Sequence, residues 1–296
     1  MKKTFIISLL LLLSIVLTGC EEEDTGPSGP VPVPEVICKG VGFEYDYESL
    51  TYNLVWSDEF DGTELDLEKW GYEINGSGGG NNELQYYTDE NTVVEDGLLK
   101  IIAKNEEYLS RDYTSSRITT ENIFEFTYGV VEIRSKQPAG LGTWAAHWMM
   151  PAYPTYGGWP NSGEIDIMEF VGYDPTKIHS TIHTQLFNHK INTQKGRTKT
   201  VETATTDFHV YKVEWLPDKM IFSIDGETYF THQPGKYLDC PESNQWPFDK
   251  DFFIILNIAI GGDWGGANGV NPDDFPTTME VDYVRVYQAE EFEDLE

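Results

Sequence analysis

The sequence predicts an all-β protein built as a two-sheet sandwich or jelly roll. Three observations predict it: from about residue 52 onward there is no sustained 3.6-residue apolar period, short alternating or apolar runs recur, and turn residues separate them. A single sheet could not cover its own apolar face, so many short strands joined by tight turns indicate two packed sheets. No internal repeat or domain boundary interrupts residues 40–290.

The expected strands differ in pattern but share a length of four to nine residues, which is typical of strands. They are 98–103, 129–134, 165–170, 178–184, 211–215, 221–224, 252–260 and 281–287. Asp225-Gly226 between two apolar segments predicts a hairpin turn. Residues 65–70 allow a single helical turn.

Composition excludes several classes of protein. The 296 residues hold 20 Lys plus Arg against 50 Asp plus Glu, a net charge of −30, which repels phosphate backbones and argues against a nucleic-acid partner. An aromatic content of 14% is not that of a disordered acidic chain. Three cysteines do not form a disulfide framework; Cys38 and Cys240 could pair or remain free thiols.

Residues 1–19 are predicted to be a signal peptide. Lys2 and Lys3 precede an apolar run over 5–17, shorter than the roughly 20 residues that span a bilayer, and small residues lead to Cys20. The stretch resembles a bacterial lipoprotein signal, which implies that Cys20 is lipidated and becomes the first mature residue. Removing Lys2 and Lys3 leaves 18 − 50, a charge of −32. The membrane would then be contacted only through the lipid anchor.

An acidic and Pro-rich tether is expected over 20–40, followed by a catalytic domain over 41–290 and an acidic tail over 291–296. The acidic run 21–24 resembles the surface-export signal of lipoproteins in the Bacteroidetes. It implies an outer-membrane lipoprotein exposed at the cell surface. A periplasm-facing protein with a merely solvated linker is the alternative.

One apolar strand carries three acids within six residues: Glu164, Asp166 and Glu169. On a regular strand Glu164 and Asp166 share a face and Glu169 points to the other. An unpaired carboxylate in the core is costly, so we expect a bulge near residues 167 and 168 that returns Glu169 to the face of its partners.

Three crowded carboxyls repel each other's charge, which raises at least one pKa. That asymmetry gives the ionised nucleophile and the protonated acid of glycoside hydrolysis, which in retaining enzymes lie ~5 to 5.5 Å apart. A solvated polar face or a cation site is the alternative interpretation.

The motifs around these acids resemble glycoside hydrolase family 16, in its laminarinase-like branch. The similar segments span about residues 52–288: Val55–Gly62 (VWSDEFDG), Asn82–Tyr87 (NELQYY), Trp144–Met149 (WAAHWM), Trp159–Glu169 (WPNSGEIDIME), Trp246–Phe248 (WPF), Gly261–Trp264 (GGDW) and Val281–Tyr287 (VDYVRVY). The resemblance implies a concanavalin A-like β-jelly roll with a concave substrate cleft and a retaining endo-β-glycanase. By position, Glu164 would be the nucleophile, Glu169 the acid/base, and Asp166 the group that tunes them.

The resemblance also implies substrate-binding residues, each of which could instead be a core or surface residue: Asn82, Arg117, Trp144, Trp159, His183 and Trp264. His183 is expected near the acid/base as a hydrogen-bonding partner. Trp148 is expected inside the core, and His147 could face either side. The spacing of His179 and His183 does not suit a zinc site.

No cofactor is expected for catalysis. Family resemblance places a structural Ca²⁺ on the convex side, held by Asp282 and backbone oxygens including that of Gly97, with Glu59 a possible ligand; calcium favours such oxygen sets.

The expected function is endo-hydrolysis of β-1,3-glucan, as polysaccharide or oligosaccharide, by a monomeric domain. The same chemistry on mixed-linkage β-glucan or a marine galactan is the nearest alternative. A non-catalytic lectin, or an acidic structural surface protein, would not require the three acids together.

Overall fold

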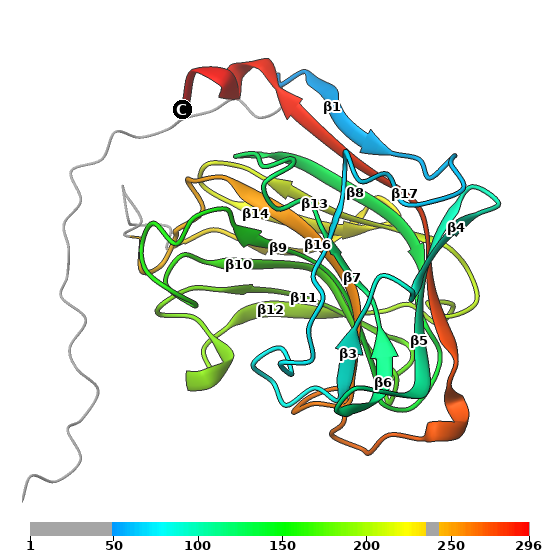
Figure 1. The fold of residues 1–296 in the computed structure, drawn as a ribbon. Coiled ribbons are helices and arrows are strands. Elements are labelled where there is room, and N and C mark those ends of the chain that lie inside the picture. Colours follow the sequence, from blue (N-terminus) through cyan, green and yellow to red (C-terminus); the bar gives the residue numbers. More distant parts are fainter. Residues whose placement is uncertain (1–48, 235–242, 296) are drawn as a thin grey trace, which may run out of the picture. The chain divides into compact units, whose positions relative to one another are not determined.

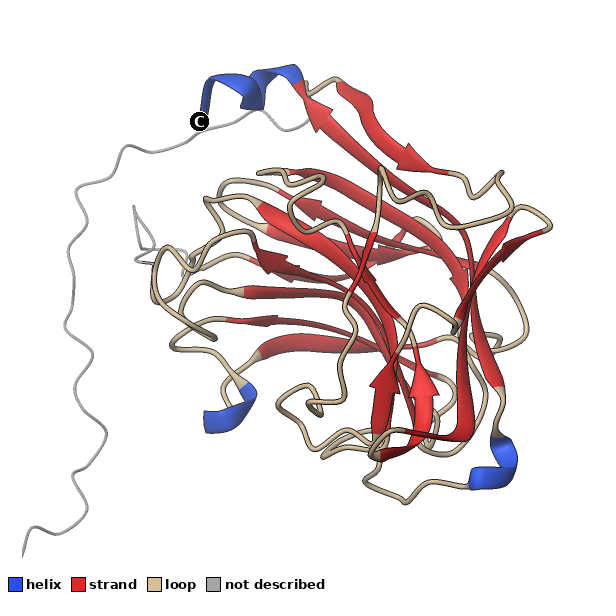
Figure 2. Ribbon diagram, in the orientation of Figure 1, coloured by secondary structure: helices blue, strands red, loops and turns tan. Residues whose placement is uncertain are grey.

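The computed structural model describes residues 49–234 and 243–295, with no side chains described for 293–295. Strands form nearly all of its regular structure, and the few short helices lie in connections between strands or after the last strand (Figure 1, Figure 2). The signal peptide, the tether, Cys20, Cys38 and Cys240 lie outside the described residues. Within the described part, no helix is long and apolar enough to span a membrane.

The larger sheet has ten strands in the order β15-β14-β13-β8-β17-β5-β6-β3, with β1 beside β17 and β4 beside β5. Their bounds are β1 Tyr52–Asp58, β3 Gln85–Tyr87, β4 Thr92–Glu95, β5 Leu98–Tyr108, β6 Arg111–Ser115, β8 Gly129–Lys136, β13 His209–Trp215, β14 Met220–Ile224, β15 Glu227–His232 and β17 Thr277–Ala289.

The second sheet has seven strands in the order β12-β11-β10-β9-β16-β7-β2. Its strands are β2 Gly71–Tyr72, β7 Arg117–Thr119, β9 Thr143–Pro151, β10 Glu164–Val171, β11 Lys177–His183, β12 Lys195–Thr200 and β16 Phe252–Ile260, and the 3₁₀-helices are η1 His189–Ile191, η2 Pro272–Asp274 and η3 Glu290–Leu295. The two-sheet prediction is confirmed.

The sheets pack their apolar faces against each other around one core. β16 is buried along its whole length, as its run of apolar residues around Asn257 predicts. Trp70, Trp215 and Phe252 are among the largest fully buried side chains. Because the inner face of each sheet is closed, polar side chains of the seven-stranded sheet gather on its outer face.

Two predicted local structures are confirmed. Asp225 and Gly226 connect β14 to β15, with φ values of 50° and 79° that suit a tight hairpin turn. The amide of Trp70 donates to the carbonyl of Asp66 at 2.9 Å, which is the single helical turn expected over 65–70.

The expected C-terminal tail is partly attached to the domain. It begins in η3, where Phe292 is 4% exposed and lies edge-on to Tyr128 with ring centroids 5.8 Å apart. An apolar residue inside the acidic segment thus packs into the core.

Candidate active site

The strand β10 contains the predicted bulge. Asp166 pairs with Thr181 and Glu169 with His179 on β11, and the register shifts between the two pairs; the same shift occurs against β9 between Asp166 and Met168. The extra residue changes the side-chain alternation at this point. Glu164, Asp166 and Glu169 therefore share one face, although five residues separate the first from the last.

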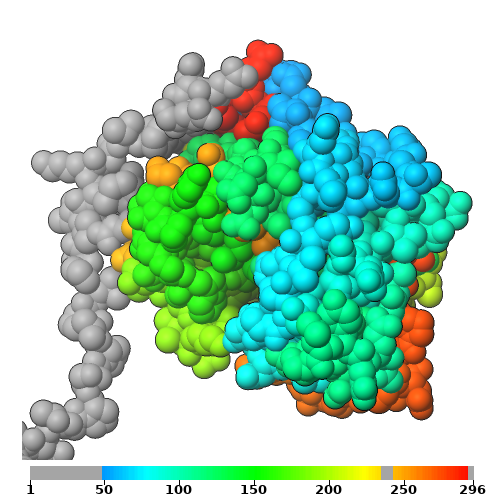
Figure 3. Space-filling model, in the orientation of Figure 1, coloured from blue at the N-terminus to red at the C-terminus, as the bar shows by residue number. Residues whose placement is uncertain are grey.

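That face borders a cleft on the outside of the seven-stranded sheet. Ile165, Met168 and Phe170 are fully buried in the core. The three acids instead line the cleft together with residues of β7, β9 and β16 and of the loop before β3. On this side of the molecule, segments from the first third of the chain lie against segments from its middle (Figure 3).

A larger hollow lies elsewhere, where Asn53, Asp249 and Gln288 meet. Its acids are already engaged, because Tyr156 donates its hydroxyl hydrogen to Asp249 and Thr127 donates to Asp251 at 2.5 Å. The cleft with the three carboxyls is the site with reactive chemistry.

Each acid in the cleft has a specific partner. The indole N–H of Trp159 donates to Glu164, and that of Trp144 donates to Oε1 of Glu169 at 3.2 Å. Nε2 of His183 lies 3.3 Å from Oδ2 of Asp166. These partners orient the carboxyls toward the cleft.

Burial raises the pKa of all three acids. For Glu164, burial and then the charge of Asp166 raise the pKa to about 8, while His183 and the Trp159 hydrogen bond oppose the rise. For Glu169, burial and then Asp166 raise the pKa well above its ordinary value. Burial also raises the pKa of Asp166. A buried group of three carboxyls thus holds at least one proton near neutral pH, as an acid catalyst requires.

Aromatic rings surround the acids at both ends. Trp264 lies edge-on to Trp144, with ring centroids 5.4 Å apart, and edge-on to His179 at 5.0 Å. Trp159 is 37% exposed and lies 4.9 Å from the ring of His189. Trp144 and Trp159 therefore lie beside the acids, where they were expected, and Trp264 lies against Trp144.

His183 lies at a different position from the one expected. It pairs in register with Glu164, whereas His179 lies opposite Glu169. His183 is therefore next to Asp166 and the expected nucleophile. Donor atoms of Glu164, Asp166 and His183 lie within 4.8 Å of one another, so among the described residues this cluster could also hold a metal ion.

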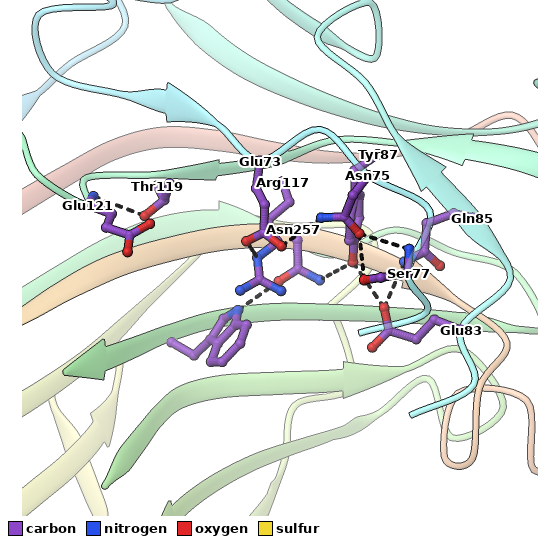
Figure 4. A network of polar contacts seen from close by, with 11 residues as sticks. Glu73, Asn75, Ser77, Glu83, Gln85, Tyr87, Arg117, Thr119, Glu121 and Asn257 are labelled. Atoms are coloured by element: carbon purple, nitrogen blue, oxygen red, sulfur yellow. Dashed lines mark hydrogen bonds and ion pairs between the residues drawn. The ribbon is translucent and has the colours of Figure 1, made fainter. Parts of the chain in front are cut away.

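The prediction that Trp148 packs inside the core is wrong. It is half-buried and lines the cleft, and the guanidinium of Arg117 lies 4.7 Å from its ring centroid. Arg117, as expected, is in the cleft, with Nε 2.8 Å from Glu73 (Figure 4). His147 is fully buried on the opposite face, where burial lowers its pKa to about 3.

Asn82 is placed differently from the expectation. It is exposed, and its amide donates to Asp263 at 2.8 Å, which ties the loop before β3 to the loop after β16. Its neighbour Asn81 lines the cleft instead. The side chain of Arg111 supports the same loop by donating to the carbonyls of Gly76 and Glu83.

The residues expected to hold calcium meet around β17. β1 ends opposite Val284, Leu99 of β5 lies opposite Val281, and the register of β17 shifts between Val281 and Tyr283. Glu59, Gly97 and Asp282 therefore lie where these three strands adjoin. The Glu59 carboxylate, however, forms two hydrogen bonds with Arg285, and Asp282 pairs with Arg134.

Several cleft residues were missed in the sequence. Asn257 could have been found, because it interrupts the apolar run of β16 and a lone polar residue there needs a buried hydrogen-bond partner. Glu83 and Tyr87 belong to the NELQYY segment, but their position depends on tertiary contacts with β16.

Comparisons with known proteins agree with this geometry. The sequence model of Glycosyl hydrolases family 16 matches residues 80–285. A Beta-glucanase of Rhodothermus marinus is 48% identical over 259 residues, covering 85% of this chain and 90% of that protein. The X-ray structure of the laminarinase from Rhodothermus marinus superimposes with a TM-score of 0.79 at 47% identity, over 81% of this chain and 99% of the other.

A third similarity comes with a sugar complex. A mutant of a non-specific endo-β-1,3(4)-glucanase from family GH16 is 44% identical with a TM-score of 0.76. It was co-crystallised with 1,3-β-D-cellotriosyl-glucose and presents 1,3-β-D-cellobiosyl-glucose at its active site. The match covers 80% of this chain and 95% of that one.

Proposed function

The chain belongs to glycoside hydrolase family 16, and we propose that it is a retaining endo-β-1,3-glucanase in which Glu164 attacks and Glu169 donates the proton. The observation that supports these roles most is the bulge in β10, because it brings both acids to one face of the cleft. The identities to a Beta-glucanase and a laminarinase support the substrate class.

The first step forms the glycosyl-enzyme. An oxygen of the ionised Glu164 bonds to the anomeric carbon while the glycosidic bond breaks, and the leaving oxygen takes the proton of Glu169. In the second step Glu169 removes a proton from water, the water oxygen bonds to the anomeric carbon, and Glu164 leaves as a carboxylate. Two inversions give net retention.

Asp166 acts between these groups. Its charge raises the pKa of Glu169, which keeps that acid protonated before the first step. His183 lies beside Asp166, with Nε2 3.3 Å from Oδ2. Family 16 hydrolysis uses no cofactor, so side chains and water supply every proton and electron pair in this mechanism.

A parallel reducing-end assay on laminarin, lichenan, agarose and carrageenan tests the proposal. We expect the highest kcat/KM on laminarin, with products longer than one sugar. Substantial activity on lichenan would fit the mixed-linkage alternative, which the similarity to a non-specific β-1,3(4)-glucanase favours. Binding of laminarin without cleavage would support a lectin and contradict the proposal.

A structural calcium ion is also part of the proposal. The ligands would be the Asp282 carboxylate, which binds Arg134 through Oδ2, and backbone oxygens including that of Gly97, an oxygen set that calcium favours. Glu59 fits less well as a side-chain ligand, because Arg285 lowers its pKa and occupies both of its oxygens.

Lipidation of Cys20 and cell-surface exposure on the outer membrane complete the proposal, supported by the sequence of residues 1–24. We expect Cys20→Ser to move the protein out of the membrane fraction, because nothing else would hold the domain there. Protease accessibility on intact cells separates a surface location from a periplasm-facing one.

A further inference from the structure

A hydrogen-bonded chain of four side chains runs through a part of the cleft wall that the mechanism does not use (Figure 4). The hydroxyl of Tyr87 donates to Oε2 of Glu83 at 3.3 Å, and Nδ2 of Asn257 donates to that hydroxyl oxygen at 3.1 Å. The indole N–H of Trp148 donates to Oδ1 of Asn257 at 2.7 Å. All four side chains border the cleft.

The two ends of this chain fix the direction of every bond within it. An ionised carboxylate only accepts hydrogen bonds, and an indole N–H only donates them. The hydroxyl of Tyr87 and the amide of Asn257 therefore have one compatible orientation each. Burial and then the charge of Glu83 raise the pKa of Tyr87 well above its ordinary value, so the phenol keeps the proton that it donates.

Glu83 is held in this position at a structural cost. Its side chain is 6% exposed, and among the described residues no Lys or Arg forms an ion pair with it; Gln85 donates to Oε2 at 2.7 Å. Gly79, with φ of 58°, makes room for it, since a Cβ at residue 79 would lie 2.2 Å from Oε1. A buried charge without a cation destabilises a fold unless its hydrogen bonds compensate, so the position of Glu83 depends on the donors around it.

Trp148, at the far end, lies beside the catalytic strand. It is the register partner of Asp166 across β9 and β10, and Arg117 covers part of its ring. Its only polar group is directed into the wall by Asn257. The ring therefore adds apolar surface to the cleft, of the kind on which the flat C–H faces of sugar rings stack.

We propose that Glu83 is a positioning residue for substrate binding: through Tyr87 and Asn257 it fixes the indole of Trp148 as a rigid sugar-binding surface next to Asp166. This inference rests on the proposed glycosidase function. A side chain that is already fixed loses less conformational freedom when a sugar binds, so the expected benefit is in affinity.

Tyr87→Phe tests the chain, with Tyr86→Phe as the matched control, because Tyr86 contacts Tyr108 at 5.1 Å and takes no part in these bonds. The first measurement is hydrogen exchange of the Trp148 indole N–H by NMR, with the resonance identified by its loss in Trp148→Phe. We expect exchange at least fivefold faster in Tyr87→Phe and unchanged in Tyr86→Phe. Unchanged exchange in both variants would overturn the proposal.

The second measurement is steady-state kinetics on laminarin oligosaccharides with Glu83→Gln. The new glutamine amide would place a hydrogen-bond donor next to the donors of Gln85, Tyr87 and Asn81. The direction of the hydrogen bonds between these side chains would then no longer be fixed. We expect about a tenfold rise in KM, less than a twofold change in kcat, and an unmoved pH profile. A fall in kcat alone would contradict a positioning role. Should the wild type not cleave laminarin, the exchange result still decides whether the chain fixes Trp148.

Discussion

Two parts of the cleft wall are built on opposite electrostatic principles. In the part on β10, burial raises the pKa of Glu164, Asp166 and Glu169, and the charge of Asp166 raises the pKa of the two glutamates further. In the part formed by Glu83, Tyr87, Asn257 and Trp148, each side chain is hydrogen-bonded to the next one. The comparison teaches that reactive groups here are kept electrostatically strained, whereas groups that shape the cleft are kept satisfied.

The largest expected effect comes from removing Glu164, because its carboxylate oxygen forms the bond to the sugar in the first step. We expect Glu164→Gly to lower kcat by about 10⁴-fold or more, because no covalent intermediate can form. Azide should partly restore turnover of an activated β-glucoside and give an α-glycosyl azide, which NMR identifies. A β-azide would instead mean that Glu164 is the acid/base.

Glu169→Ala should be the next largest, with kcat on laminarin reduced about 10² to 10⁴-fold through loss of the general acid. An activated aryl glycoside, whose leaving group needs little protonation, should still form the intermediate. Azide should then give a β-product, distinguished from the α-product by its anomeric coupling constant. Equal losses on laminarin and on the aryl glycoside would argue against an acid role.

Asp166→Asn removes a charge beside Glu164 and Glu169 but leaves both of these reacting acids in place. Because the Asp166 charge raises the pKa of both Glu164 and Glu169, its loss should lower both pKa values and move both limbs of the kcat/KM profile to lower pH. The alkaline limb reports deprotonation of Glu169, so activity should fall at a lower pH than in the wild type. Asp273→Asn, exposed in η2, is the control for loss of a charge. A pH profile of kcat/KM identical to that of the control would mean that Asp166 has only a structural role.

The smallest effect should come from calcium removal, which leaves both parts of the cleft untouched. If calcium binds only the folded domain, chelation should lower Tm by about 5 °C while kcat changes little. Differential scanning calorimetry with and without added Ca²⁺ measures the shift. Protein that contains calcium but melts at the same temperature after chelation would exclude a stabilising ion.

The same comparison explains which residues were predictable from the sequence. Glu164, Asp166 and Glu169 lie on one strand, so residue spacing alone was enough to infer their common face and the bulge. Trp148 was predictable in principle, since period-two alternation along β9 places it with Trp144 and opposite His147. The relation of Glu83 and Tyr87 to Asn257 was not, because it depends on how the loop before β3 packs against β16.

Because of the bulge in β10, the geometry of the active site depends on how many residues separate Asp166 from Glu169 and not on which residues they are. Replacing Met168 with another apolar residue keeps the count, and deleting one residue between Asp166 and Glu169 would remove the bulge but leave the three acids on one face. Inserting one residue there, beside the existing bulge, would turn Glu169 toward the core. A substitution scan would therefore classify Ile167 and Met168 as ordinary core residues. A single-residue insertion, in contrast, would show that the number of residues at this point sets the face on which Glu169 lies.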